Sequence, residues 1–417
     1  MMILRPGKQL ALVAALTTLV ATACADATPP RFAILNPEVL EAARAFASSG
    51  NPLMAAAVAH LRDEADAALK AGPFTVTDKT FLPPNGDKHD YMSISYYAWP
   101  NPSTPDGLPY LIRDGEPSPD VGKYDAPKLG QMAGAVESLA LAYWFTRDEA
   151  YARHAADLLR VFFLDPATRM NPNMNFAQGI PGVDKGENYG IIDSVSLATR
   201  VVDAVAILGR SKSWTQADQQ GLEAWFWAYT NWLQHSKLAS YERRQFNNHG
   251  LWYDAQVSAY AILTGRPRLA ADVIATSSRR RVLVHVMPDG RQPWELLRTK
   301  SWHYSMYNLD AMFSLASMGE KVGVDLWRFT GSDGRGLRRA LDYLVPYAAP
   351  ASSWRYRQIT PRGSADLLPF LGVAARIYDE PFYARLMEKM VAAPPAYHVG
   401  NREILSLTDY LLATRGH

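Results

Sequence analysis

Two short segments of this chain combine side chains that can move protons with side chains that can bind an anion. The first spans residues 246–253 and places Asn248 and His249 where a loop is expected to enter a helix. The second packs four polar side chains into seven positions before an apolar helix: Arg298, Lys300, His303 and Tyr304. Histidine titrates near neutrality and can act as a base, whereas tyrosine can donate a proton or, when ionised, accept one.

Together the two segments supply what β-elimination from a uronic acid requires. The C5 proton is poorly acidic while the neighbouring carboxylate is ionised, so a site must neutralise that carboxylate. Arg298 and Asn248 can do this through charge-assisted and amide hydrogen bonds. A base must then remove the proton, and an acid must protonate the departing O4.

Substrate stereochemistry decides how many proton-transfer groups are needed. Mannuronate and glucuronate carry H5 and O4 on the same face, so one tyrosine can serve as both base and acid. Guluronate places them on opposite faces and would require His249 as a separate base opposite Tyr304. Each segment also has a structural interpretation, because an asparagine at a helix start is commonly a cap and clustered cations can form a solvated face.

The same two segments and an earlier one resemble a known family. The three segments read DYMSISYYAWPNPSTPDGLPY over residues 90–110, NNHGLWYD over 247–254 and PDGRQPWELLRTKSWHYSMYNL over 288–309. They resemble the alginate-lyase superfamily of helical-toroid polysaccharide lyases and are most similar to the branch with alginate and glucuronan lyases. The likeness extends over roughly residues 75–320.

The resemblance implies an (α/α) toroid that cleaves a 1,4-linked uronan, such as alginate, polymannuronate or glucuronan, to give 4,5-unsaturated ends. It also implies four catalytic residues: Asn248, His249, Arg298 and Tyr304. Compared with the better-known family pattern, the interval between the arginine and the tyrosine is one residue shorter here. Tyr307 is therefore a rival for the acid role.

Further side chains are candidate contacts to a sugar chain because rings pack on sugar faces and amides or cations bind substituents. These candidates are Tyr96, Trp99, Arg113, Gln178, Arg244, Trp252, His303 and Tyr307. Trp99 follows alanine where relatives tend to carry a second tryptophan, so one wall of the cleft is expected to differ. Turn formation could equally explain Gln178, solvation could explain Arg244, and His303 could orient Tyr304 or cap its helix.

The elements that must position these residues are predicted to be helices. Apolar residues recur three and four positions apart along most of the chain from Pro37 onward. The clearest predicted helices are 52–71, 130–147, 149–163, 191–209, 215–236, 250–264, 304–318, 335–347, 364–377, 380–391 and 402–414. Short turns suggest antiparallel pairs, and the lack of a fixed-period repeat favours a closed toroid over an open solenoid.

Residues 26–417 are expected to form one domain, because no linker or charge run divides them. Two long segments interrupt the helical pattern. Residues 76–125 are rich in proline, and residues 169–190 are rich in asparagine and glycine. Long loops in a compact domain are usually functional, so both are expected to lie over one mouth of the toroid.

Residues 1–25 resemble an export signal, because Arg5 and Lys8 precede an apolar stretch that ends in small residues. This leader predicts a periplasmic protein. Cys24, the only cysteine, could either lie in a weak lipobox, giving an outer-membrane lipoprotein, or belong to an ordinary cleavage site. The folded part is then expected to hold no disulfide and no cysteine metal site.

The balance of charge and the sequence motifs limit the classes of partner that the protein is expected to bind. Without the two basic residues of the leader, 41 basic residues balance 41 acidic ones, which is unlike a nucleic-acid-binding protein. An anionic uronan must therefore be bound by a local cluster of cations. The histidines are scattered, and no metal, nucleotide or serine-nucleophile motif is present, so we expect chemistry without a metal or cofactor.

Two other classes of function remain open from the sequence. A glycoside hydrolase on the same helical architecture would need two carboxyl groups flanking the bond, and Asp254, Glu295 and Asp310 are near the proposed site in sequence. A non-catalytic glycan-binding lipoprotein would use the aromatic side chains for capture alone. Mutating the carboxylates distinguishes the first from a lyase, and turnover distinguishes the second.

Overall fold

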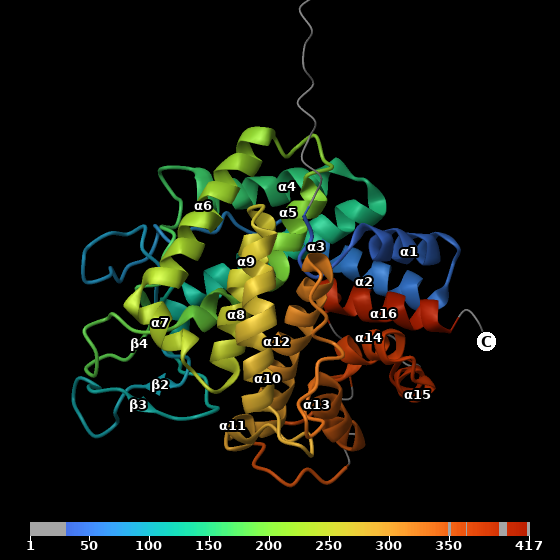
Figure 1. Ribbon diagram of the computed structural model, residues 1–417. Coiled ribbons are helices and arrows are strands. Elements are labelled where there is room, and N and C mark those ends of the chain that lie inside the picture. The colour runs from blue at the N-terminus through green and yellow to red at the C-terminus, as the bar shows by residue number, and fades with distance from the viewer. Residues whose placement is uncertain (1–30, 349–351, 364, 392–397, 415–417) are drawn as a thin grey trace, which may run out of the picture.

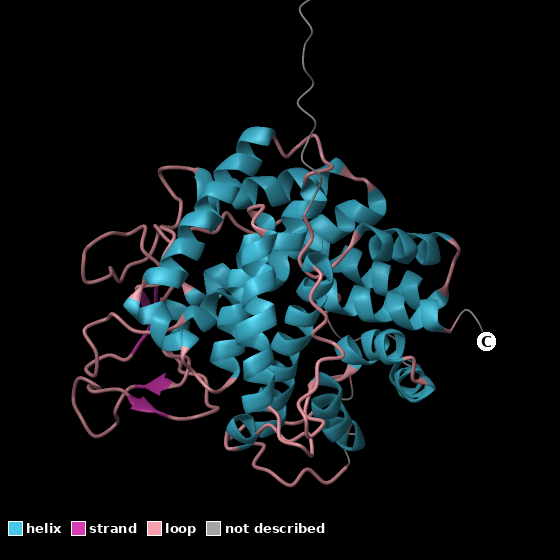
Figure 2. Cartoon of the chain, viewed as in Figure 1, coloured by secondary structure: helices cyan, strands magenta, loops and turns pink. Residues whose placement is uncertain are grey.

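The computed structural model describes residues 31–348, 352–363, 365–391 and 398–414. The predicted leader and Cys24 lie outside this range. Helices dominate the described chain, and short strands and loops gather at one side (Figures 1 and 2). The helices are α1 (Pro37–Ser48), α2 (Pro52–Ala68), α3 (Ala126–Thr146), α4 (Glu149–Leu159), α5 (Val202–Leu208), α6 (Gln216–His235), α7 (Lys237–Arg243), α8 (Asn248–Leu263), α9 (Pro267–Asp272), α10 (Arg279–His285), α11 (Pro293–Leu296), α12 (Ser301–Val322), α13 (Leu337–Leu344), α14 (Leu368–Tyr378), α15 (Pro381–Val391) and α16 (Asn401–Ala413).

The arrangement closes on itself. Helix α1 packs against both α2 and α16, so the first and last helices of the described chain are neighbours (Figure 1). Successive helices such as α3 and α4 also pack as pairs. The predicted (α/α) toroid is confirmed.

Helices α8 and α12 lie deep in the molecule and pack against each other. Every residue of α8 except His249 is buried, and α12 is buried along most of its length. A helix that is apolar on all sides belongs in the interior of a large fold. These two helices therefore give the residues at their N-terminal ends a rigid support.

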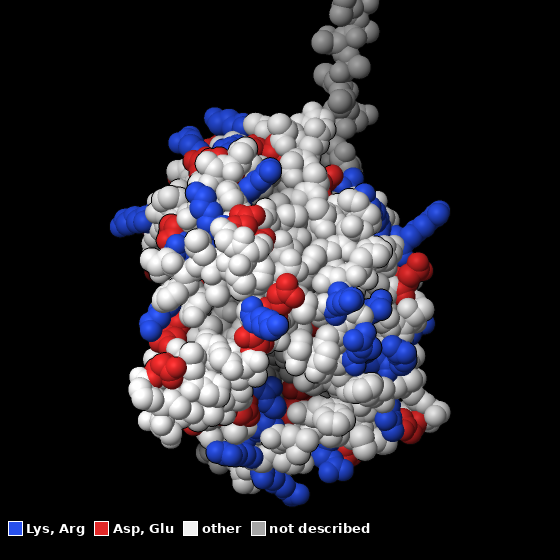
Figure 3. Space-filling view, turned by 90° about the vertical axis from the view of Figure 1, so that its left-hand side faces the viewer, with Lys and Arg blue, Asp and Glu red and all other residues white. Residues whose placement is uncertain are grey.

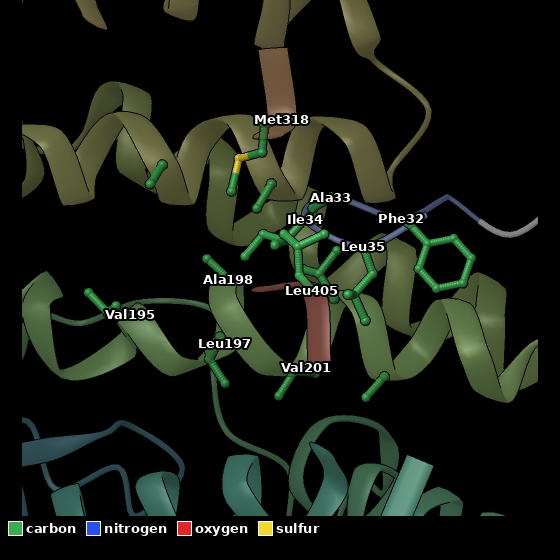
Figure 4. Close-up of a cluster of buried hydrophobic side chains, with 14 of the residues drawn as sticks. Phe32, Ala33, Ile34, Leu35, Val195, Leu197, Ala198, Val201, Met318 and Leu405 are labelled. Atoms are coloured by element: carbon green, nitrogen blue, oxygen red, sulfur yellow. The ribbon is translucent and has the colours of Figure 1, made fainter. Parts of the chain in front are cut away.

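The start of the described chain is anchored in the core. The side chains of residues 32–35 pack beside Val201, Met318 and Leu405 (Figure 4). The buried carboxylate of Asp203 accepts hydrogen bonds from the backbone N–H groups of Ala33, Ile34 and Leu35 at 2.7–3.3 Å. This segment has no helix or strand of its own, so Asp203 provides the acceptors that buried backbone donors need.

All of the clearly predicted helices are present, with shifted ends. The stretch 267–285, which the pattern did not predict as helical, forms α9 and α10 joined by a π-helical turn at Val273–Ser278. A π turn inserts an extra residue and shifts the phase of the apolar pattern. A second π turn, Leu197–Val201, interrupts the helix predicted at 191–209.

The two long non-helical segments contain short strands that were not predicted. Strand β1 (Met92–Ile94) pairs in parallel with β4 (Phe176–Gly179), which joins the two segments side by side. Strand β2 (Ala98–Trp99) pairs antiparallel with β3 (Leu111–Ile112). The strands lie together at the left of Figure 1. Among the described residues, no helix is long and apolar enough to cross a membrane.

Candidate active site

Arg298 and Tyr304 are in direct contact. Arg298 lies in the turn between α11 and α12, and Tyr304 lies in the first turns of α12. The Nη2 group of Arg298 donates to the Tyr304 hydroxyl at 2.7 Å, and its Cζ atom lies 3.7 Å from the centre of the tyrosine ring. Asp114 accepts from Nε and Nη2 of Arg298 at 3.0 and 2.5 Å. Asp114 also accepts a hydrogen bond from the backbone N–H of Thr299 at 2.8 Å, so it links the guanidinium of Arg298 to the backbone of the turn before α12.

The Tyr304 hydroxyl has a second partner in Tyr97, whose hydroxyl lies 2.7 Å away. Burial and the hydrogen bond with Tyr97 raise the pKa of Tyr304 well above its ordinary value, and the positive charge of Arg298 offsets only part of that rise. If Tyr304 loses its proton, both Arg298 and Tyr97 can donate to the phenolate oxygen. The arrangement can therefore stabilise an ionised tyrosine in a buried position.

Asn248 and His249 begin helix α8, as the sequence predicted. The side chain of Asn247 caps the helix by accepting from the His249 backbone N–H at 3.2 Å. The backbone N–H and side-chain amide of Asn248 donate to the two carboxylate oxygens of Glu295 at 2.7 and 2.8 Å. Gly250 follows because a side chain there would collide with the guanidinium of Arg281, 2.4 Å from its Cβ position.

His249 is held by a buried carboxylate. Its Nδ1 atom lies 2.8 Å from Oε2 of Glu242, a residue of α7 with no exposed surface. Burial lowers the pKa of His249, but the negative charge and hydrogen bond of Glu242 outweigh it, so the pKa is raised above its ordinary value. The imidazole is 24% exposed, and the hydrogen bond that its ring makes to a described residue is the one between Nδ1 and Glu242.

These contacts bring the four predicted catalytic residues into one site. The charges of Arg298 and His249 both act on Glu295, which binds Asn248. A guanidinium, an imidazole, an amide and a tyrosine hydroxyl therefore converge, and each of the first three is bonded to its own carboxylate. Such a set can bind an anion and transfer a proton beside it. Tyr307, the rival acid, makes no hydrogen bond to Arg298 and instead packs its ring on Trp252, with centroids 4.9 Å apart.

A cavity of about 670 Å³ adjoins this site. Three of the predicted sugar contacts, Trp252, His303 and Tyr307, line it. The rings of His303 and Tyr307 are nearly parallel, with centroids 6.2 Å apart. The face that carries the strands is hollowed, and basic and acidic side chains meet within the hollow (Figure 3).

The other predicted sugar contacts are more dispersed. Tyr96 is exposed and packs edge-on against Tyr97, the hydrogen-bond partner of Tyr304. Arg113 stacks on Trp99 with its Cζ atom 4.6 Å from the ring centre, on the β2–β3 hairpin that also leads to Asp114. Arg244 donates to Ser240 at the end of α7 and makes no hydrogen bond or ion pair with the four catalytic candidates.

Gln178 is tied to a residue that sequence reasoning missed. Its side-chain amide donates at 2.7 Å to Asp193, and its backbone adopts the unusual φ of 54°. Asp193 is half-buried and also accepts from Tyr91 and Ser93. It lines the cavity and lies within electrostatic reach of Glu242. These hydrogen bonds fix the loop that carries Gln178 to Asp193, which lines the cavity.

The carboxylates that a hydrolase would need have other partners. Asp254 forms a buried ion pair with Arg281 at 2.8 Å, Asp310 pairs with Arg402, and Glu295 binds Asn248. No cluster of three or more His, Cys, Asp or Glu residues in the described chain could hold a metal ion.

A helical toroid that brings a guanidinium, an imidazole and an amide together with a buried tyrosine is the arrangement expected of a polysaccharide lyase. The comparisons with known proteins agree. The alginate lyase family profile matches residues 75–354. An alginate lyase from Bacteroides ovatus has 40% sequence identity and a TM-score of 0.83, with 89% of this chain and 98% of that chain covered.

Alginate lyase A1-III from Sphingomonas species A1 shares the fold at 16% identity and a TM-score of 0.56, covering 90% of this chain and 97% of its own. A histidine-to-alanine variant of alginate lyase A1-III complexed with a tetrasaccharide gives 15% identity and a TM-score of 0.57, covering 90% and 96%. No curated protein sequence matches. The chain belongs to the alginate lyase family and is a polysaccharide lyase that cleaves a uronic-acid polymer by β-elimination.

Proposed function

We propose that this lyase acts on a 1,4-linked uronan whose H5 and O4 lie on the same face, namely polymannuronate, mannuronate-rich alginate or glucuronan. The observation that carries this proposal is the Tyr304 hydroxyl, which accepts a hydrogen bond from Arg298 and shares another with the Tyr97 hydroxyl, each at 2.7 Å. A tyrosine with these partners can act as a phenolate base and then return the proton as an acid. One residue then serves both steps of a syn elimination.

The other three residues neutralise the substrate carboxylate. We assign His249 the role of a donor rather than a base, because the contact between its Nδ1 atom and the Glu242 carboxylate favours the protonated ring and raises its pKa. Asn248 retains one amide proton beyond the one given to Glu295, and Arg298 supplies a guanidinium. Withdrawing charge from the carboxylate makes the C5 proton acidic enough for Tyr304 to remove.

In the elimination, the C5–H electron pair forms the C4–C5 double bond while the C4–O4 bond breaks. Tyr304 takes the proton from C5 and gives a proton to the departing O4. The atoms balance without water or an oxidant. One product fragment has a new reducing end, and the other carries a 4,5-unsaturated uronate at its non-reducing end.

The site of action follows from the leader. Residues 1–25 have the pattern of an export signal, so we propose that the enzyme acts in the periplasm, with Cys24 as a candidate for lipid attachment. Cell fractionation and mass spectrometry of the mature N-terminus would test both parts. A mature chain that retains the leader in the cytoplasm would contradict export.

The experiment for substrate follows absorbance near 235 nm, where the unsaturated product absorbs. Purified enzyme is incubated separately with polymannuronate, polyguluronate, glucuronan and a neutral glucan. We expect an increase with polymannuronate, glucuronan or both, and little with polyguluronate. Preferred cleavage of polyguluronate would overturn the syn proposal, and new reducing ends without absorbance would indicate hydrolysis.

A further inference from the structure

Glu242 is a buried carboxylate with an unusual lack of partners. Its side chain has no exposed surface, and Oε2 lies 2.8 Å from Nδ1 of His249. Its other oxygen, Oε1, is buried without any hydrogen-bond partner in the described chain. By contrast, Glu295 and Asp114 each use both carboxylate oxygens on donors from the protein.

This isolation matters energetically. A buried carboxylate without a cation costs several kcal/mol in real proteins, so an ionised Glu242 needs a positive partner. His249 is the one group that donates to it among the described residues. The pair comes from two consecutive helices, α7 and α8, which pack together and fix the distance between the two side chains.

The other charged groups around His249 include both negative and positive side chains, which have opposite effects on its pKa. Glu295, on α11, adds a second negative potential, and Arg298, from the following turn, opposes it. Asp193 and Tyr189, from the neighbouring turn and loop, lie within electrostatic reach of Glu242. Arg281, from α10, packs beside Gly250 but is neutralised by Asp254. Glu242 is the charge in direct contact.

We propose that Glu242 is a positioning residue that keeps His249 doubly protonated, with Nδ1–H bound to its carboxylate and Nε2–H directed to the uronate carboxylate. The inference rests on the proposed role of His249 as a neutralising donor. It assigns Glu242 no contact with substrate, because the carboxylate is fully buried. The raised pKa of His249 is consistent with this arrangement.

Glu242→Gln tests the charge separately from the geometry. Glutamine keeps an oxygen that can accept from Nδ1–H but removes the negative charge, so His249 should lose its proton at lower pH. We expect kcat/KM to fall at least about tenfold near pH 8, since one pKa unit changes the protonated fraction about tenfold. The ratio of variant to wild-type kcat/KM should increase toward one as pH is lowered.

A purely structural role for Glu242 predicts a ratio that does not change with pH. Glu64→Gln is the matched control, because it removes a carboxylate from another histidine, His398, which keeps Glu137 as a partner. Its ratio should be flat. Circular dichroism and the thermal midpoint of each variant establish that it is folded.

A direct measurement follows the imidazole Cε1–H resonance of His249 by NMR, assigned by its loss in His249→Gln. The wild-type resonance should titrate above the ordinary value near 6.5 and that of Glu242→Gln below it. Equal midpoints would overturn the inference. This readout needs no substrate, so it stands even if the enzyme prefers polyguluronate, whereas that preference would refute only the proposed function.

Discussion

The guanidinium of Arg298 both donates to the hydroxyl of Tyr304 at 2.7 Å and lies over its ring, with Cζ 3.7 Å from the ring centre. The same cation can therefore favour the phenolate and remain within reach of a substrate carboxylate. This relationship separates Tyr304 from Tyr307, which lies one turn further along α12 without that contact.

Tyr304→Phe should abolish elimination while leaving the fold intact. The ring packing is kept, and only the proton-transfer group is lost, so kcat should fall by about a thousandfold or more. Tyr307→Phe is the matched control and should retain kcat within about tenfold, because an aromatic ring that lines the cavity contributes to substrate binding rather than to proton transfer. Absorbance at saturating substrate measures both. An inactive Tyr307→Phe beside an active Tyr304→Phe would reverse the assignment.

Asp114→Asn should reduce kcat/KM without unfolding the protein. The carboxylate holds Arg298 through Nε and Nη2 and is partly exposed. Loss of a charge-assisted contact of about 1.5–3 kcal/mol predicts a fall of about tenfold to a hundredfold. Steady-state kinetics check this, with the thermal midpoint as the stability control. Unchanged kinetics would mean that the guanidinium keeps its position without the negative charge of Asp114.

Tyr97→Phe should lower kcat more than it raises KM. Its hydroxyl is the second partner of Tyr304, and losing one net hydrogen bond of about 0.5–1.5 kcal/mol predicts up to about tenfold slower turnover. The neighbouring substitution Tyr96→Phe, at an exposed ring, is the comparison. A change confined to KM would assign Tyr97 to sugar binding instead.

Asp254→Asn should destabilise the fold rather than remove the chemistry. Asp254 and Arg281 are both almost fully buried, and removing one partner of such a pair costs about 3–5 kcal/mol. Urea unfolding measures the loss, and activity per folded molecule is compared at low temperature. A fully stable but inactive variant would support a hydrolase acid at this position.

His398 should make stability depend on alkaline pH. It lies between Glu64 and Glu137, whose hydrogen bonds raise its pKa to about 10. A folded pKa above the unfolded value means that the stabilisation is complete below about pH 6.5 and is lost as pH rises through about 10. Because 38% of the side chain is exposed, the contribution is about 1 kcal/mol or less.

Urea unfolding of wild type and His398→Gln checks this sign. The two free energies of unfolding should differ most near neutral pH and converge at alkaline pH. A difference that grows with pH would contradict the assignment of a charged His398.

The catalytic candidates could be predicted from the sequence because they occur in two short segments. Asn248 and His249 lie together at a helix start, and Tyr304 follows Arg298 by six positions, so local pattern and family likeness could locate them. Glu242 carried no signal of its own, because an acidic residue near a helix end is ordinary. Only the packing of α7 against α8 shows that it faces His249.

Asp114 lies 184 residues before its partner Arg298, and Tyr97 lies 207 residues before Tyr304. No periodic pattern reports pairings over such separations. The same limit applies to strands β1 and β4, which are too short for alternation to be recognised and exist because two loops meet. Long helices could be predicted because each carries its own repeating apolar face.

The contact between α1 and α16 affects how the protein unfolds. An open solenoid has exposed end repeats from which unfolding can spread step by step. In this ring each terminal helix is covered by the other, and the segment bound to Asp203 adds a further tie near the first helix. Fraying at one end should therefore expose the other, and denaturant should melt the described helices in one concerted transition.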